Sequence, residues 1–326
     1  MLAFFRFLVT VVFCTCLAGG ATAQDEEGHV ALGMTDYRGW QGLADLPDSP
    51  ALAGIGVSLD IRRYPDQRVA VTAFLSGEVG LIAISNVDLL LMIGQSEVFP
   101  PSVVVLPTDV SQGADMVLMR AGRDVMQMAR TGVATPRPSV SSYLLFRATE
   151  SFLKDLPNRP AIRDRSQPDA VAGFLSGDFD FISVRDPALP RGRNSDDVAV
   201  IFDSTELNGE IFNLLVMRRE LEDQFPGLTA ALQDGWYRGD DPSAGDEAGF
   251  RLLRDREAGL RFLLSGKMQS DLLRIKTFVT SITRQTVMNK VLGDFGIRFA
   301  DGMLIGDPSN VLLEFSLPDG AATPLR

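Results

Sequence analysis

The sequence predicts an α/β protein with two similar lobes, and three observations support this. A segment occurs twice, as VTAFLSGEVGLIAIS at Val71–Ser85 and as VAGFLSGDFDFISVR at Val171–Arg185, with an offset of 100 residues between the two starts. Apolar runs of strand length alternate with helical patterns along most of the chain. The 326 residues, 45% of them hydrophobic, are enough for two cores. Two lobes suggest a cleft between them, which is a favoured place for a small ligand.

Each copy of the repeat combines a short amphipathic helix, an acidic turn and an apolar strand. Pro65-Asp66 opens the first of these helices, and Gly77 and Gly177 stand where a helix C-terminus favours a left-handed residue. The strand of the first copy is expected at Glu78–Ser85. The repeat therefore predicts one helix–turn–strand unit in each lobe.

Other strands are expected where short apolar or alternating runs occur. The wholly apolar SVVVL run at Ser102–Leu106 is typical of a buried parallel strand. The remaining expected strands are His29–Met34, Ser58–Tyr64, Asp115–Met119, Gly132–Ala134, Ala161–Asp164, Val198–Phe202 and Ile211–Met217.

Helical patterns fill the spaces between these strands. A helix is expected to start at Ser139–Ser142, because proline and serine precede an apolar run there. Residues 218–299 are predicted to be mostly helical, with a loop at Gly239–Gly249, and Met303–Leu317 to form a terminal hairpin with its turn at Asp307–Asn310. The other helical regions are Gln41–Ile55, which proline interrupts, Asn86–Ile93 and Arg123–Arg130.

The first 23 residues have the pattern of a cleavable secretory signal. Arg6 precedes a mostly apolar run, and Ala21-Thr22-Ala23 supplies small residues at the cleavage position. The apolar run is shorter than the roughly 20 residues of a membrane span. We therefore expect export to the periplasm with cleavage after Ala23; an uncleaved anchor is the alternative.

Composition and residue content exclude several function classes. The formal net charge of −11 argues against nucleic acid as a partner, because phosphate binding needs a basic face. Both cysteines, Cys14 and Cys16, lie in the expected signal, so no thiol nucleophile is expected, and the single histidine, His29, cannot build a histidine-rich metal site. The sequence does not contain the glycine spacing of a phosphate-binding loop or of a dinucleotide-binding motif. No catalytic residues, metal or cofactor are predicted.

Four segments resemble the periplasmic solute-binding proteins of ABC importers, in the group for nitrate, sulfonates, taurine and the thiamine pyrimidine. In order along the chain these segments are DYRGWQG at Asp36–Gly42, the two Phe-Leu-Ser-Gly units, SQGADMV at Ser111–Val117, and DSTELNGEIFNLLVM at Asp203–Met217. The resemblance covers roughly residues 30–226. Two positions depart from the family pattern: Gly80 stands where an aspartate is usual, and Arg185-Asp186-Pro187 stands where a tryptophan often follows the strand.

The resemblance implies a two-lobe periplasmic-binding-protein fold of type II, in which a ligand cleft separates two mostly parallel sheets flanked by helices. It implies lobe 1 at 24–118 and 214–326, the latter including a helical tail, and lobe 2 at 119–213. The implied function is an exported monomer that captures a small polar solute by lobe closure and delivers it to an inner-membrane permease. An enzyme on the same fold, similar to pyrimidine synthases or dehydratases, and a sensor or accessory binding protein are the alternatives.

Candidate ligand contacts are polar or aromatic residues at expected strand ends, lobe crossings and helix starts. Each has a structural alternative: a helix cap for Ser139, Ser85 and Asn86, a local turn for Asp115, a core position for Trp40, and mutual pairing for Arg185 and Asp186. Because acidic side chains outnumber arginines among the residues expected at the cleft, a purely anionic ligand such as nitrate is disfavoured. The candidates are Trp40, Ser85, Asn86, Ser111, Gly113, Asp115, Ser139, Ser141, Ser142, Arg185, Asp186, Asp203 and Ser204.

Overall fold

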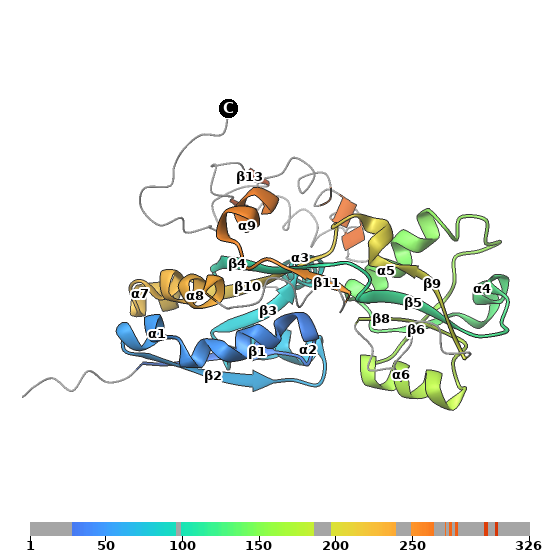
Figure 1. Cartoon of the computed structure of the whole chain (residues 1–326). Coiled ribbons are helices and arrows are strands. Elements are labelled where there is room, and N and C mark those ends of the chain that lie inside the picture. Colours follow the sequence, from blue (N-terminus) through green and yellow to red (C-terminus); the bar gives the residue numbers. More distant parts are fainter. Residues whose placement is uncertain are drawn as a thin grey trace, which may run out of the picture.

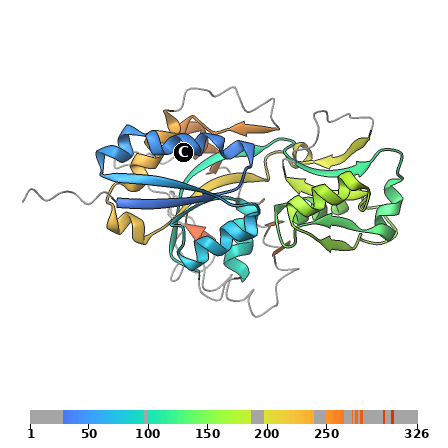
Figure 2. The same ribbon diagram turned by 90° about the horizontal axis from the view of Figure 1, so that it is seen from below.

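The computed structural model describes residues 28–95, 99–185, 197–238 and 249–263, together with residues 271, 274–275, 278–279, 297–298 and 304–305. Two lobes lie side by side, each built on its own sheet (Figure 1). The same two lobes are seen from below in Figure 2, joined by the chain segments that cross between them. The expected signal segment and Asp186 lie outside the described residues.

The first lobe contains a six-stranded sheet in the order β11-β4-β10-β3-β1-β2. Helices α2 and α3 pack on one face around Phe74, and α1, η1 and α8 pack on the other around Trp40 and Trp236. Its strands are β1 (Gly28–Met34), β2 (Val57–Arg63), β3 (Leu81–Ser85), β4 (Ser102–Ser111), β10 (Phe212–Arg218) and β11 (Phe250–Leu252). Its helices are η1 (Arg38–Asp48), α1 (Pro50–Gly54), α2 (Gln67–Ser76), α3 (Asn86–Gln95), α7 (Glu220–Gln224), α8 (Leu228–Tyr237) and α9 (Arg256–Leu263).

The second lobe contains a five-stranded sheet in the order β7-β6-β8-β5-β9. Tyr143 of α5 belongs to the core on one side of this sheet, and Phe174 of α6 to the core on the other. Its strands are β5 (Asp115–Arg120), β6 (Val133–Thr135), β7 (Ile162–Asp164), β8 (Phe181–Arg185) and β9 (Val198–Asp203). Its helices are η2 (Val125–Gln127), α4 (Met128–Thr131), α5 (Val140–Glu150) and α6 (Gln167–Ser176). The chain crosses between the lobes twice, first between β4 and β5 and again between β9 and β10, and η3 (Ser204–Leu207) lies at this second crossing.

The two-lobe α/β fold is confirmed, but the sheets are mixed rather than mostly parallel. In the first lobe β1 pairs in parallel with β2 and β3, whereas β10 runs antiparallel to β3 and β4. The run at Ser102–Leu106 belongs to β4, which is therefore antiparallel to both of its neighbours, β10 and β11. An apolar run reports burial on both faces and not strand direction, which explains this error. The boundaries expected after residues 118 and 213 fall inside β5 and β10.

The described residues of the C-terminal part are mostly helical, as expected, in α7, α8 and α9, but two strands that were not expected also occur there. Residues 250–252 form β11 at the edge of the first sheet, where three residues pair with β4. The expected hairpin at 303–317 lies largely outside the described residues. In the described part, β12 (Ile297–Arg298) pairs with β13 (Leu304–Ile305), which places a hairpin pairing earlier in the chain than expected.

The sequence repeat is a structural repeat. Helices α2 and α6 both end at a left-handed glycine, Gly77 with φ 81° and Gly177 with φ 95°. An arginine from an antiparallel strand donates to the end of each helix: Arg218 of β10 to the Phe74 carbonyl and Arg120 of β5 to the Phe174 carbonyl. The equivalence thus extends beyond the 15-residue repeat to strands that are not part of it.

One departure from the resembled pattern, Gly80, has a local explanation. A Cβ added at Gly80 would lie 2.5 Å from Cδ1 of Leu221, so α7 occupies the space that a larger residue would need. At the equivalent position in the second lobe, Asp180 pairs with Arg123, with 3.0 Å between Oδ1 and Nε. Gly80 therefore reflects the packing of α7, which has no counterpart beside Asp180 in the second lobe as described.

Replacing either repeat glycine by alanine tests this equivalence. Each of Gly77→Ala and Gly177→Ala is expected to lower the free energy of unfolding by about 1–2 kcal/mol, because alanine is strained at positive φ. The added Cβ would meet its nearest neighbour at 3.5 Å or more at both sites, so strain and not a clash sets the cost. Chemical denaturation at one pH measures both variants. A cost at only one glycine would contradict the equivalence.

In the described part of the chain, no helix combines the length and apolar character that crossing a membrane requires.

Candidate functional site

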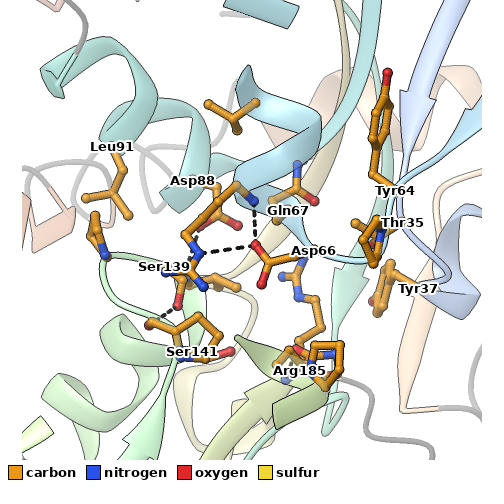
Figure 3. A pocket seen from close by; sticks show the side chains of 18 of the residues that line it. Thr35, Tyr37, Tyr64, Asp66, Gln67, Asp88, Leu91, Ser139, Ser141 and Arg185 are labelled. Carbon is orange, nitrogen blue, oxygen red and sulfur yellow. Dashed lines mark hydrogen bonds and ion pairs between the residues drawn. The ribbon is translucent and has the colours of Figure 1, made fainter. Parts of the chain in front are cut away.

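A cavity of about 770 Å³ lies between the two lobes. Its walls come from the carboxyl ends of β1 and β2 and from helices α2, α3, α5 and α6. In Figure 3, Asp66 lies near the middle of the view, between Ser139 on one side and Tyr37 on the other. The volume falls within the range of small-molecule sites, roughly 300–1,000 Å³.

The two repeat helices supply equivalent residues to this cavity. Val71 and Leu75 of α2, and Val171 and Leu175 of α6, contribute apolar surface from opposite lobes. The i, i+4 spacing places them on one face of each helix. The lining positions that correspond across the repeat are Gln67 and Gln167, Arg68 and Pro168, Val71 and Val171, Thr72 and Ala172, and Leu75 and Leu175.

Helix α5 begins at the cavity with a complete capping box. The Ser139 hydroxyl accepts from the Ser142 amide at 3.2 Å, and the Ser142 hydroxyl accepts from the Ser139 amide at 2.9 Å. Ser139 and Ser141 line the cavity, whereas Ser142 serves only the cap. The next amide, that of Val140, donates to Oδ1 of Asp88 at 2.8 Å. A carboxylate of the protein therefore already occupies part of the helix start where the sequence predicted ligand contact.

Asp88 reaches this position from helix α3 of the first lobe. Its Oδ2 accepts from the Ser85 hydroxyl at 2.8 Å, and its amide donates to the same hydroxyl at 2.9 Å. Burial raises the pKa of Asp88, and Arg185 together with these hydrogen bonds opposes that shift. Ser85 thus holds Asp88 and does not line the cavity. Asn86 also points elsewhere: it bonds the Glu210 carbonyl and the Phe212 amide.

The candidates at the two crossings bond to one another. The Ser111 hydroxyl lies 2.7 Å from the Ser204 hydroxyl and donates to Asp115 at 2.7 Å. The Gly113 amide donates to the same Ser204 hydroxyl at 2.7 Å. Asp203 caps η3 by accepting from the Thr205 amide at 2.8 Å. None of these side chains lines the cavity, so at these positions the structure favours local pairing over ligand contact.

Arg185 lines the cavity, and its guanidinium contacts several groups of the protein. Its guanidinium donates to Asp115 at 2.9 and 3.3 Å and to the Asn213 side-chain oxygen at 2.7 Å, and lies 4.8 Å from the centre of the Tyr37 ring. The side-chain amide of Gln167 in α6 makes two hydrogen bonds with the backbone of Arg185: it donates to the Arg185 carbonyl and accepts from the Arg185 amide. Among the described residues the charged partner of Arg185 is Asp115, from the first crossing. The alternative, a pairing of Arg185 with Asp186, involves a residue outside the described part of the chain.

Sequence reasoning missed Tyr37 and Asp109. The Tyr37 hydroxyl donates to Oδ1 of Asp109 at 2.8 Å, and Asn213 donates to the same oxygen at 2.7 Å. Burial raises the pKa of both Tyr37 and Asp109. Tyr37 follows the carboxyl end of β1, a position that points to ligand contact in α/β folds. The sequence favours Trp40 as the aromatic contact, but Trp40 is fully buried in the core next to Tyr37, with 5.1 Å between ring centres.

Sequence reasoning also assigned Asp66 only to the start of α2. Its Oδ1 accepts from the amide of Arg68 at 2.8 Å and from the Arg68 guanidinium at 3.2 Å. Arg68 also links the two lobes, since its guanidinium lies 3.3 Å from Oδ1 of Asp164 in the second lobe. Asp66 Oδ2 is buried and has no hydrogen-bond partner among the described residues.

The fold and this cavity together define the structural class of the protein. The chain has the two-lobe type II periplasmic-binding-protein fold, with the cavity between the lobes.

Two solved structures illustrate the similarity. One is the alkanesulfonate-binding protein SsuA from Xanthomonas axonopodis pv. citri bound to MOPS, with 13% identity, 82% of this chain and 83% of that chain covered, and a TM-score of 0.54. The other is the zinc-bound ligand-binding component of an ABC-type import system from Staphylococcus aureus, with 14% identity, 81% and 90% covered, and a TM-score of 0.53. No family model and no curated protein sequence matches the chain.

Proposed function

We propose that this protein is an exported substrate-binding protein, which captures a small polar solute containing nitrogen or sulfur and delivers it to the permease of an ABC importer. The observation that supports this proposal is the cavity of about 770 Å³ whose walls come from both lobes. The shared fold with substrate-binding components of import systems agrees with it. The protein would act as a monomer in the periplasm.

The proposed mechanism is closure of the lobes on the solute. Contacts between the lobes already exist at the cavity: Asp88 with the Val140 amide, Arg68 with Asp164, and Arg185 with Asn213. A solute that touches both walls stabilises the closed arrangement by its differential affinity for it. The permease would then recognise the closed form.

We propose binding rather than catalysis because the polar side chains at the crossings are hydrogen-bonded to one another and are therefore not directed at a substrate. Ser111, Ser204 and Asp115 form a closed hydrogen-bonded set, and Asp115 is also committed to Arg185. In the described part of the chain, no group of three or more histidine, cysteine, aspartate or glutamate residues is placed to hold a metal ion.

The test is a thermal-shift screen with nitrate, taurine, alkylsulfonates, alkylamines, aminopyrimidines, amino acids, urea and short amides. A solute at 100 times its Kd is expected to add about 2.7 kcal/mol, a rise in Tm of a few degrees. Val71→Trp is expected to abolish the shift, because Val71 lines the cavity and indole would fill it. Val69→Trp is the matched control, since Val69 lies on the same helix but is 46% exposed and outside the cavity lining.

Two outcomes would contradict the proposal. One is the absence of any shift across the panel. The other is a shift that survives Val71→Trp unchanged, which would place binding outside this cavity.

A further inference from the structure

We infer that the cavity takes an organic ammonium ion with an apolar body, and that Asp66 receives the charged nitrogen. This inference rests on the proposed binding function and names its ligand class. Three observations support it: the hydrogen bonding at the start of α5, the pairing of the two arginines that line the cavity, and the hydrogen bonding of Asp66.

The start of α5 offers little to an anion. The Ser142 amide is used by Ser139, and the Val140 amide by Asp88. Asp88 also puts a carboxylate where the helix dipole would otherwise favour a bound anion. An anionic ligand would have to displace this carboxylate or approach it against repulsion.

The guanidinium groups that line the cavity are also committed. Arg185 is divided between Asp115 and Asn213, and Arg68 between Asp66 and Asp164. Both are therefore neutralised by the protein itself, and neither is left to pair with a ligand carboxylate or sulfonate.

Asp66, by contrast, has one carboxylate oxygen, Oδ2, that accepts no hydrogen bond from the described residues. Its residue is 9% exposed, it lines the cavity, and its Oδ2 has no hydrogen-bond partner among the described residues. A buried carboxylate oxygen without a donor is costly, so a donor is expected there when the cavity is filled. An ammonium N–H supplies both the hydrogen bond and the opposite charge.

The wider charge balance points the same way. Four carboxyl groups on or next to the cavity wall are buried, and arginines pair with two of them: Arg185 with Asp115, and the partly exposed Arg68 with Asp66. A bound cation would add positive charge beside the remaining carboxyl groups. The four are Asp66, Asp88, Asp109 and Asp115.

The apolar body is assigned to the space between the repeat helices. Val71 and Leu75 face the cavity from α2, and Val171 and Leu175 from α6. Contact with both helices would bury apolar ligand surface against both lobes at once.

The experiment compares three ligands of equal chain length by isothermal titration calorimetry at pH 7. They are n-hexylamine, hexan-1-ol and hexane-1-sulfonate. The amine is expected to bind roughly ten- to hundredfold more tightly than the sulfonate, with the alcohol between them.

Asp66→Asn is the main variant. Asparagine is an equally good helix cap, so α2 is retained while the charge is lost. The variant is expected to bind hexylamine roughly ten- to hundredfold more weakly and hexanol unchanged. Asp88→Ala is the complementary variant, and it is expected to bind hexane-1-sulfonate more tightly than the parent because it frees the start of α5.

The outcomes separate the two proposals. Tighter binding of the sulfonate than of the amine by the parent, or an unchanged amine affinity in Asp66→Asn, would overturn the ammonium assignment and leave the binding function standing. Absence of binding by all three ligands also overturns the assignment. The binding function itself fails only if the wider thermal-shift panel gives no shift that Val71→Trp abolishes.

Discussion

Replacing Arg185 by methionine is expected to lower the free energy of unfolding by about 3–5 kcal/mol. The side chain is 8% exposed and that of its partner Asp115 is 0% exposed, so the variant leaves a buried carboxylate without its counter-charge. It also removes the donor to Asn213. Urea denaturation at pH 7, with the slope m compared between variants, measures the loss.

Two further variants make the result specific. The double variant Arg185→Met with Asp115→Asn is expected to regain much of the loss, because it leaves no charge unpaired. Arg63→Met is the control for an exposed pair: Arg63 and Asp36 have side chains 45% and 83% exposed, and little change is expected. A loss in Arg63→Met as large as that in Arg185→Met would contradict the argument from burial.

Phe74→Ala is expected to lower the free energy of unfolding by about 3–5 kcal/mol, because it opens a cavity in the core of the first lobe. Phe74 is 0% exposed and packs in a cluster that includes Phe99 and Phe212. Phe174, at the equivalent position, is 2% exposed but belongs to a smaller cluster, and the Arg120 guanidinium lies 5.4 Å from its ring centre. Phe174→Ala is therefore expected to cost less.

The tryptophans make the measurement selective for one lobe. The chain has two tryptophans, and both Trp40 and Trp236 lie in the core of the first lobe. Phe74→Ala should therefore shift the denaturation curve followed by tryptophan fluorescence more than Phe174→Ala does. A cost below about 1 kcal/mol for Phe74→Ala, or the reverse order of the two variants, would refute this prediction.

Local patterns were sufficient for most of the fold. The repeat predicted α2 with β3 and α6 with β8, and both helices end at the expected glycines. Strand direction was not predictable, because β4 and β1 are both apolar runs and only their partners differ. Strand β11 was missed because three residues are too few to give a periodic pattern.

The candidate site was less predictable, for a physical reason. The hydrogen-bonding groups of polar residues near strand ends can be satisfied by one another as easily as by a ligand. The hydroxyls of Ser111 and Ser204, which are 93 residues apart in the sequence, show this by bonding to each other. Asp66 and Asp88 are distinguished only by their burial and by what they bond, and both properties depend on the assembled lobes. No spacing in the sequence reports that one oxygen of Asp66 is left without a donor.

The order of the strands has a consequence for how the chain is made. All five strands of the second lobe come from one continuous stretch, residues 115–203, so this lobe can complete its sheet as soon as that stretch emerges. The first lobe cannot, because β10 lies between β3 and β4 and is synthesised about 100 residues after β4. Until β10 arrives, β3 and β4 present unpaired edges that invite pairing with other chains. The interval between these two events is when a nascent chain would depend most on a chaperone.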